Sequence, residues 1–216
     1  MIRVVIVDDE ALVRSGFSLI LGAADDIEVA DAVDGPSALG TVRREEPDVV
    51  LLDIRMPGQN GLDLLAEIRG LTSPPAVAML TTFDSDGHIA QALRAGAAGF
   101  LVKDTDPEEL PALVRSLAAG GIVFSPQVSR IVIDGYLGAS DHASTDLIGS
   151  LTGRERQVLA RLATGQSNGE IGAGLHLSVG TVKDHVSSIL GKLGVATRLQ
   201  AALIAERAGL TVKDRP

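Results

Sequence analysis

The sequence predicts an α/β fold, a doubly wound five-stranded parallel sheet, followed by a second, smaller all-α domain. Strand-length apolar runs alternate with amphipathic helical segments in the first part of the chain, and only helical patterns follow a polar stretch rich in Gly, Ser and Asp. The 216 residues suit two domains of the usual size, about 100 to 200 residues each. We expect domains at residues 1–120 and 150–216, joined by a linker at 121–149.

Composition narrows the class of protein. Apolar residues make up 45% of the chain, enough for real cores, and there is no Cys, which excludes disulfides and thiolate metal sites. No signal-peptide pattern opens the chain, and no segment approaches the roughly 20 apolar residues of a membrane span. We therefore expect a soluble, cytoplasmic protein with no membrane contact.

Charge is divided unevenly along the chain. Of 19 basic and 28 acidic residues, 9 basic and 5 acidic lie from Ser150 onward, a balance of +4. Residues 1–149 then carry 10 basic and 23 acidic residues, a balance of −13. Such a division favours two domains with different partners, one handling cations and the other a polyanion, although two ordinary solvated surfaces would also produce it.

The predicted strands are continuously apolar, which is typical of a parallel sheet covered by helices on both faces. They are Arg3 to Val7, Ile27 to Ala30, Asp48 to Leu52, Ala76 to Leu80 and Gly99 to Val102. Amphipathic helices are expected at Leu12 to Leu21, Pro36 to Arg44, Gly61 to Arg69, Asp86 to Arg94 and Asp106 to Ala119.

The last of these helices carries two start signals and one irregularity. Asp106 is expected as its N-cap with Pro107 at the first helical position. Pro111 would then lie inside the helix, remove one of its first backbone hydrogen bonds and introduce a kink.

Polar groups follow four of the predicted strands at the point where each strand ends. The stretch VVIVDDE runs from a buried strand into Asp8 and Asp9, and the third strand runs into Asp53. The fourth ends in Thr81 and Thr82, and the fifth delivers Lys103. Because ligands bind beyond the carboxyl ends of parallel strands, we expect these side chains at one rim of the sheet.

Three carboxylates at one rim repel one another unless a cation neutralises them. Oxygen ligands are the preference of Mg²⁺, and Asp53 is placed to act as a nucleophile toward phosphorus. Lys103 would pair with Asp53 or hold a phosphoryl group that Asp53 has accepted. Each residue alone is more often a cap or loop residue, and the joint pattern of four strand ends favours the site.

The motifs VVIVDDE, LLDIRMPGQNG, MLTT and GFLVKD resemble the receiver domain of bacterial response regulators, a flavodoxin-like fold. The resemblance implies that Asp53 is the phosphoacceptor. It implies a Mg²⁺ site made of Asp8, acting through a bound water, Asp9, Asp53 and the backbone carbonyl of Arg55. It also implies switch and phosphoryl-contacting roles for Thr81, Thr82, Phe100 and Lys103.

The second part of the chain predicts short, capped helices. Thr152 and Glu155 form one capping box, Ser167 and Glu170 a second, and Ser178 caps a third helix. A fourth helix is expected around Arg198 to Ala208. Such units suit a helix-turn-helix domain. The periodicity alone fits a small helical bundle for dimerisation or docking equally well.

The stretches LTGRERQVLARLATGQSNGEI and LSVGTVKDHVSSILGKLGV resemble the LuxR-type DNA-binding domain, and the domain order resembles the NarL/FixJ class of regulators. The resemblance implies a recognition helix from Ser178 to Lys192 and a dimer contact in the last helix. The expected DNA-contacting residues are Ser178, Thr181, Lys183, Asp184, His185, Ser187, Ser188 and Lys192. Asp184 places a negative charge on this helix. Gly172 stands where the family usually has Ala, and the low helix propensity of Gly predicts a weak second helix.

The resemblance implies a response regulator that accepts a phosphoryl group on Asp53 from a histidine kinase and binds double-stranded DNA as a phosphorylation-promoted homodimer. It would not be an enzyme beyond slow loss of its own phosphoryl group. One rival is a phosphatase or hydrolase with Asp53 as nucleophile; such enzymes usually carry a second acid two residues on, where this chain has Arg55. The other is a regulator whose acidic site is purely structural.

Overall fold

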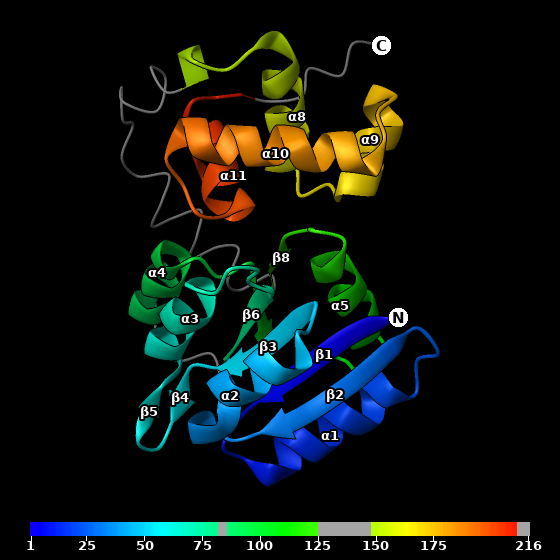
Figure 1. Ribbon diagram of the computed structural model, residues 1–216, viewed down its shortest axis with the longest axis vertical. Coiled ribbons are helices and arrows are strands. Elements are labelled where there is room, and N and C mark those ends of the chain that lie inside the picture. Colours follow the sequence, from blue (N-terminus) through cyan, green and yellow to red (C-terminus); the bar gives the residue numbers. More distant parts are fainter. Residues whose placement is uncertain (82–85, 125–147, 211–216) are drawn as a thin grey trace.

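The computed structural model describes residues 1–81, 86–124 and 148–210 of the chain. It consists of an α/β unit and a smaller helical unit that lies against one end of it (Figure 1). None of the helices in these three segments combines the length and the apolar character needed to cross a membrane.

The α/β unit is built on a parallel sheet with the strand order β2-β1-β3-β6-β7-β8. Its strands are β1 (Ile2–Val7), β2 (Ile27–Val33), β3 (Val49–Asp53), β6 (Ala76–Thr81), β7 (Gly99–Val102) and β8 (Val123–Phe124). The five predicted strands are all present. The sixth, β8, is a two-residue addition that pairs with β7 and lies in the segment predicted as linker.

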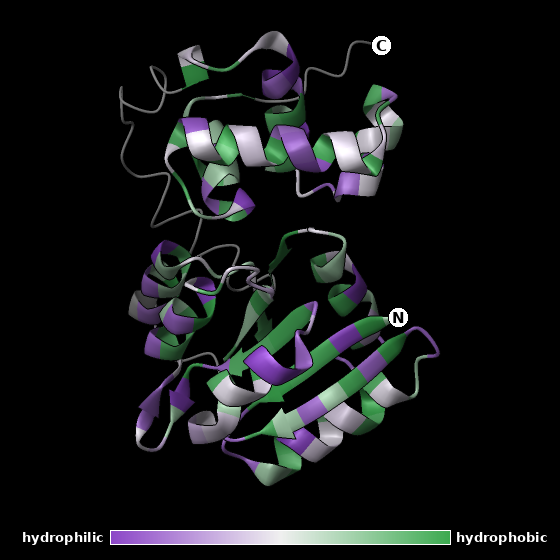
Figure 2. Ribbon diagram, in the orientation of Figure 1, coloured by the Kyte–Doolittle hydropathy of each residue, from purple (hydrophilic) through white to green (hydrophobic). Residues whose placement is uncertain are grey.

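Five helices cover the two faces of the sheet: α1 (Ala11–Gly22), α2 (Gly35–Glu45), α3 (Gly61–Arg69), α4 (Asp86–Ala95) and α5 (Leu110–Ala118). Alternate residues of β3 enter two separate cores. Val50 and Leu52 pack with α2, α3 and α4, whereas Val49 and Leu51 pack with α1 and α5. Both faces of β3 are therefore buried, which is why its residues from Val49 to Leu52 are all apolar (Figure 2).

The start of α5 differs from the prediction. Asp106 Oδ1 accepts a hydrogen bond from the backbone N–H of Glu108 at 2.9 Å and so organises a turn, and the helix begins only at Leu110. Pro111 therefore occupies the first helical turn instead of the helix interior. The N–H groups of a first turn have no partner within the helix, so the proline costs no hydrogen bond and the expected kink has no cause.

A short hairpin follows β3 and leads into α3. Its strands are β4 (Arg55–Met56) and β5 (Gln59–Asn60), which pair antiparallel around Gly58 at φ +76°. Gly61 then passes so close to β3 that a Cβ at this position would collide with the backbone oxygen of Asp53. Glycine at position 61 thus lets the chain fold back tightly beside Asp53.

The helical unit comprises α8 (Gly153–Ala163), α9 (Asn168–Leu175), α10 (Val179–Leu193) and α11 (Arg198–Arg207). The capping boxes at Thr152 and Ser167 are present as predicted, and Ser178 caps α10. A further box, Thr197 with Gln200, opens α11. A shared apolar core joins the four helices, with α10 contributing Val182, Ile189 and Leu193.

Gly172, which is predicted to weaken α9, permits a close packing contact. A Cβ on Gly172 would lie 2.7 Å from the backbone oxygen of Leu177, closer than real contacts allow. Glycine lets the turn after α9 approach the helix, so the loss of intrinsic helix propensity is offset by close packing.

The two units touch mainly through α11. The side-chain amide of Gln200 donates to the backbone oxygens of Leu93 and Arg94 at 2.9 and 3.1 Å, in the last turn of α4. Arg69 Nη2 donates to the backbone oxygen of Ala196 at 2.9 Å. Leu199 is 1% exposed and belongs to the core beneath α2, α3 and α4.

Candidate functional site

The carboxyl ends of β1, β3, β6 and β7 bring the predicted polar side chains to one edge. Val7 pairs with Leu52, and Asp53 pairs with Leu80, so Asp8 and Asp53 emerge side by side. Carboxylate oxygens of Asp8, Asp9 and Asp53 all lie within 4.8 Å of one another. Arg14 holds the turn after β1 by donating to the backbone oxygens of Asp8 and Asp9 at 2.7 and 3.0 Å.

Lys103 supplies the positive charge of this cluster. Its Nζ lies 2.9 Å from Asp53 Oδ2 and 3.0 Å from Asp8 Oδ2. Burial by itself lowers the pKa of Lys103, but the interactions with the carboxylates of Asp53, Glu10 and Asp8 outweigh it, and the net shift is upward. The ammonium group is therefore permanently charged at neutral pH.

Asp53 is a buried carboxylate in an electrostatically unfavourable place. Its side chain is 5% exposed, and desolvation raises its pKa, with the neighbouring charge of Asp8 acting in the same direction and Lys103 against it. The backbone N–H of Arg55 donates to Asp53 Oδ1 at 3.3 Å. The carboxylate is thus held in a fixed orientation without being neutralised.

The donor set at this edge fits a hard cation. Asp8 Oδ2 is completely buried and accepts no hydrogen bond from the described residues, although it lies near the ammonium of Lys103. A buried carboxylate oxygen without a hydrogen bond is costly, and a cation held by the three carboxylates would remove that cost.

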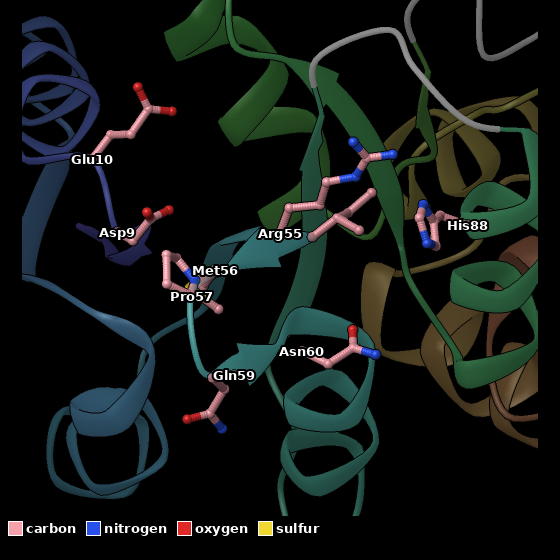
Figure 3. A pocket seen from close by; sticks show the side chains of 9 residues that line it. Asp9, Glu10, Arg55, Met56, Pro57, Gln59, Asn60 and His88 are labelled. Carbon is pink, nitrogen blue, oxygen red and sulfur yellow. The ribbon is translucent and has the colours of Figure 1, made fainter.

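Two cavities open over the cluster. The smaller, about 130 Å³, is lined by Asp53, Thr81 and Lys103 together with Glu10, Ile54, Arg55 and His88. The larger, about 700 Å³, lies between the β1–α1 turn and the β4–β5 hairpin. Figure 3 shows it with Asp9 and Glu10 on one side, His88 of α4 on the other, and Arg55 to Pro57 between them.

The remaining residues of the predicted set are placed differently. Thr81 ends β6 and is half-buried at the smaller cavity, whereas Thr82 lies outside the described residues. Phe100 is fully buried in β7, with its ring centroid 6.1 Å from that of Phe124. Glu10 and His88 were not predicted at the site. Glu10 carried a signal, because it directly follows Asp9, but His88 had none.

The predicted DNA-contacting residues lie on or just before α10. All of them are solvent-exposed except His185, which is half-buried, while Val182 and Ile189 turn inward. Ser178 is occupied as the N-cap and shares a hydrogen bond of 2.9 Å with the hydroxyl of Thr181.

Comparison with known proteins matches both units to families. Residues 4–115 match the family described as response regulator receiver domain, and residues 149–205 match the bacterial regulatory proteins of the luxR family. This chain is a response regulator with a LuxR-type DNA-binding domain.

Several regulators are similar to this chain over nearly its whole length. The transcriptional regulatory protein LnrK of Bacillus subtilis is 36% identical over 219 residues, covering 98% of this chain and all of that protein. The probable transcriptional regulatory protein NarL of Mycobacterium tuberculosis is 38% identical over 206 residues, covering 95% of this chain and 93% of that protein. The crystal structure of the response regulator ChrA from a heme-sensing two-component system matches with a TM-score of 0.53 and 33% identity, covering 97% of this chain and 98% of that chain.

Within the DNA-binding domain of this response regulator, the exposed residues Ser188 and Lys192 also contact a neighbouring helix. Ser188 Oγ donates to Glu155 Oε1 at 2.7 Å, and Lys192 Nζ lies 2.8 and 2.7 Å from the two oxygens of Glu155. Glu155 also accepts from the backbone N–H and hydroxyl of Thr152. These two residues of the predicted set therefore tie α10 to the start of α8.

Lys183 faces the receiver domain. It lines a cavity of about 730 Å³ between the two domains, together with Arg43, Glu46 and Asp48 of the receiver. Helix α10 thus places a basic residue at the boundary with the receiver.

Proposed function

We propose that this response regulator accepts a phosphoryl group on Asp53 from a histidine kinase and, as a phosphorylation-promoted homodimer, binds double-stranded DNA to regulate transcription in the cytoplasm. The observation that carries the proposal is the position of Asp53, a buried carboxylate between the ammonium of Lys103 and two further carboxylates at the mouth of a cavity.

Asp53 acts as the nucleophile. One of its oxygens attacks phosphorus, and the bond between phosphorus and the nitrogen of the donor imidazole breaks, its electron pair leaving with the nitrogen. Asp8, Asp9, Asp53 and the backbone carbonyl of Arg55 would hold Mg²⁺, which when bound neutralises charge on the phosphoryl oxygens. Lys103 lies within hydrogen-bond distance of Asp53 and holds a phosphoryl oxygen after transfer.

The switch needs more than one contact. Moving a two-state population from 1:99 to 99:1 takes about 5.5 kcal/mol, whereas one hydrogen bond to a charged group contributes about 1.5 to 3 kcal/mol. Thr81, Thr82 and Lys103 therefore act together with a rearrangement of Phe100 in the core.

Helix α4 connects this switch to the DNA-binding domain. His88, in its first half, lines the cavity at Asp53, and the backbone oxygens of Leu93 and Arg94 near its end accept from Gln200 of α11. A shift of α4 on phosphorylation would weaken the contact with α11. Release of the DNA-binding domain would then move Lys183 away from the receiver, beside which it lies in this structure.

DNA binding rests on few positive charges. Lys183 is exposed on α10, while Asp184 beside it either accepts from a base amino group or repels phosphate. One domain should therefore bind weakly and in a salt-dependent manner. Two domains joined as a dimer on two half-sites would multiply the affinity.

The first test addresses the phosphoacceptor. We expect the full chain, treated with phosphoramidate and Mg²⁺, to gain one labile phosphoryl group, and Asp53→Asn to gain none, because an amide is not a nucleophile toward phosphorus. Intact-mass spectrometry measures the adduct. Light scattering measures dimerisation, and a separate binding assay measures the affinity for DNA.

Asp63→Asn is the matched control, since Asp63 is exposed on α3 outside the cavity lining. It should behave as the wild type. Normal dimerisation and DNA binding by treated Asp53→Asn would overturn the proposal. Rapid turnover of diverse phosphoesters by the wild type would instead indicate a hydrolase.

The second test addresses the contact between the domains. Gln200→Glu keeps the side-chain oxygen that accepts from the backbone N–H groups of Ala196 and Thr197, but it replaces the amide donor facing Leu93 and Arg94 with a carboxylate. The carboxylate repels the two backbone oxygens. We expect unphosphorylated DNA binding to rise about fivefold or more, measured by fluorescence anisotropy.

Gln157→Glu, an equal charge change on the exposed side of α8, is the control for altered attraction to DNA. It should weaken binding slightly. If Gln200→Glu also binds no better than the wild type, the contact through α11 does not restrain the DNA-binding domain.

A further inference from the structure

Carboxylates of its own chain surround the ammonium group of Lys103. Its Nζ donates to Asp53 Oδ2 and to Glu10 Oε1, each at 2.9 Å, and lies 3.0 Å from Asp8 Oδ2. An ammonium has three N–H donors, and here three carboxylates surround it. Because three carboxylate oxygens lie within 3.0 Å of Nζ, a phosphoryl oxygen on Asp53 approaches Lys103 most readily if one of these contacts is given up.

Glu10 is the partner that can leave most easily. The side chains of Asp8 and Asp53 are 0% and 5% exposed, whereas that of Glu10 is 59% exposed. A carboxylate near water is readily solvated on leaving, while a buried one would lose the charge of Lys103 without gaining water. Glu10 also lines both cavities above the cluster, on the path of an incoming phosphodonor.

The position of Glu10 in the chain is unusual for its residue type. It is the N-cap of α1, where a short polar side chain normally accepts from the first turn, yet its side chain makes no such hydrogen bond. Its backbone N–H donates to Asp8 Oδ1 at 2.9 Å, which fixes its place beside the cluster. The longer side chain reaches Lys103 instead of capping its own helix.

We propose that Glu10 is a positioning residue that holds Lys103 in the unphosphorylated receiver and yields its hydrogen bond to a phosphoryl oxygen when Asp53 is phosphorylated. The inference rests on the proposed function of Asp53. With phosphoramidate as donor, an Asp53 oxygen forms a bond to phosphorus and the phosphorus–nitrogen bond breaks. The electron pair leaves with nitrogen, which departs as ammonia with the proton that phosphoramidate already carries.

The test separates the hydrogen bond of Glu10 from its charge. Glu10→Gln removes the charge, whereas Glu10→Asp keeps it but is one methylene shorter and is suited to cap α1. We expect both variants to bind beryllium trifluoride, a non-covalent phosphoryl mimic, more tightly in saturating Mg²⁺. We also expect both to react faster with phosphoramidate, each by about two- to fivefold, the scale of an exposed ion pair.

A spectroscopic readout reports on Lys103 itself. In the wild type without mimic, the Lys103 ammonium should give an observable proton–nitrogen NMR signal, because three carboxylates slow its exchange with water. In both Glu10 variants the signal should broaden through faster exchange. Glu67→Gln, an equal charge change on the exposed face of α3, should leave the signal, the affinity and the rate as in the wild type.

Several outcomes would overturn the inference. If Glu10→Asp matches the wild type while Glu10→Gln is faster, Glu10 acts through charge alone. If neither variant differs from a wild type that is phosphorylated on Asp53, the inference fails and the proposed function stands. If the wild type takes up neither phosphoryl group nor mimic, the proposed function itself fails. Thermal unfolding by circular dichroism verifies that each variant is folded.

Discussion

Two charged clusters of this protein differ in their ratio of hydrogen-bond donors to carboxylates. At the edge of the receiver sheet, the single ammonium of Lys103 lies within 3.0 Å of oxygens from Asp8, Glu10 and Asp53. In the DNA-binding domain, the single carboxylate of Glu155 accepts from Lys192, Ser188 and Thr152. Among the described residues, the first cluster leaves a carboxylate oxygen of Asp8 without a hydrogen-bond donor, whereas both oxygens of Glu155 accept hydrogen bonds.

The pKa shifts follow this difference. The pKa of Asp53 is raised, chiefly by burial, and a buried oxygen of Asp8 accepts no hydrogen bond from the described residues. Hydrogen bonds, that from Lys192 first, lower the pKa of Glu155 to about 2. A carboxylate cluster short of donors can accept a cation or react, whereas a satisfied carboxylate fixes two helices together.

The largest expected effect concerns the satisfied cluster. Glu155→Gln replaces a charge-assisted acceptor of Lys192 with an amide and disturbs the capping box of α8. Because the Lys192 side chain is 36% exposed, its ammonium returns to water instead of remaining buried and unpaired. We expect the free energy of unfolding at pH 7 to fall by about 1.5 to 3 kcal/mol, measured by urea denaturation of the full chain.

The same cluster predicts an acid dependence of stability. A folded-state pKa below the ordinary 4.5 gives stability that is present above pH 4.5 and is lost as the pH falls toward about 2. Glu155→Gln should flatten this part of the profile. Glu206→Gln, an exposed change on α11, should alter stability by less than about 0.5 kcal/mol. If the Glu155→Gln protein is as stable as this control, the hydrogen bonds of Glu155 do not stabilise the packing of α8 against α10.

A smaller effect of opposite sign is expected at the cluster short of donors. The raised pKa of Asp53 means that its charged form destabilises the folded receiver at pH values above that pKa. Asp53→Asn removes the charge, so at pH 7 with a metal chelator present we expect the free energy of unfolding to rise by up to about 1 kcal/mol. Urea denaturation measures the change.

Added Mg²⁺ should reverse this order. A ligand that binds only the folded state stabilises it more as its concentration rises above its Kd, and the wild type retains a carboxylate that the variant lacks. Asp63→Asn should follow the wild type under both conditions. If Asp53→Asn is destabilising in the presence of chelator, the donor shortage carries no energetic cost, and the contrast between the two clusters fails.

Much of the fold could be predicted because its signals are local. Continuous apolar runs located the five long strands, although β2 extends to Val33, three residues past the predicted end. The N-caps at Thr152, Ser167 and Ser178 each require only neighbouring residues, and all three are present. At the site, the predicted ends of the strands were enough to place five residues at one edge of the sheet: Asp8, Asp9, Asp53, Thr81 and Lys103.

The rest depends on contacts between distant residues. Helix α5 starts at Leu110 because Asp106 caps a turn before it, and Gly172 is required by the approach of Leu177. Ser188 and Lys192 lie on the outer side of α10 in the pattern, yet Glu155 of α8 binds both. None of these partners is encoded by the periodicity of a single segment.

By itself, the sequence determined the order and type of the elements and the edge at which the charged groups gather. Those features follow from side-chain size, from the period of apolar residues and from the fact that parallel strands end at the same side. Only the tertiary structure decided that Glu10 shares Lys103, that Glu155 holds Lys192 and that Gln200 reaches the end of α4. Hydrogen bonds and ion pairs require angstrom-scale distances, which depend on how whole elements pack together.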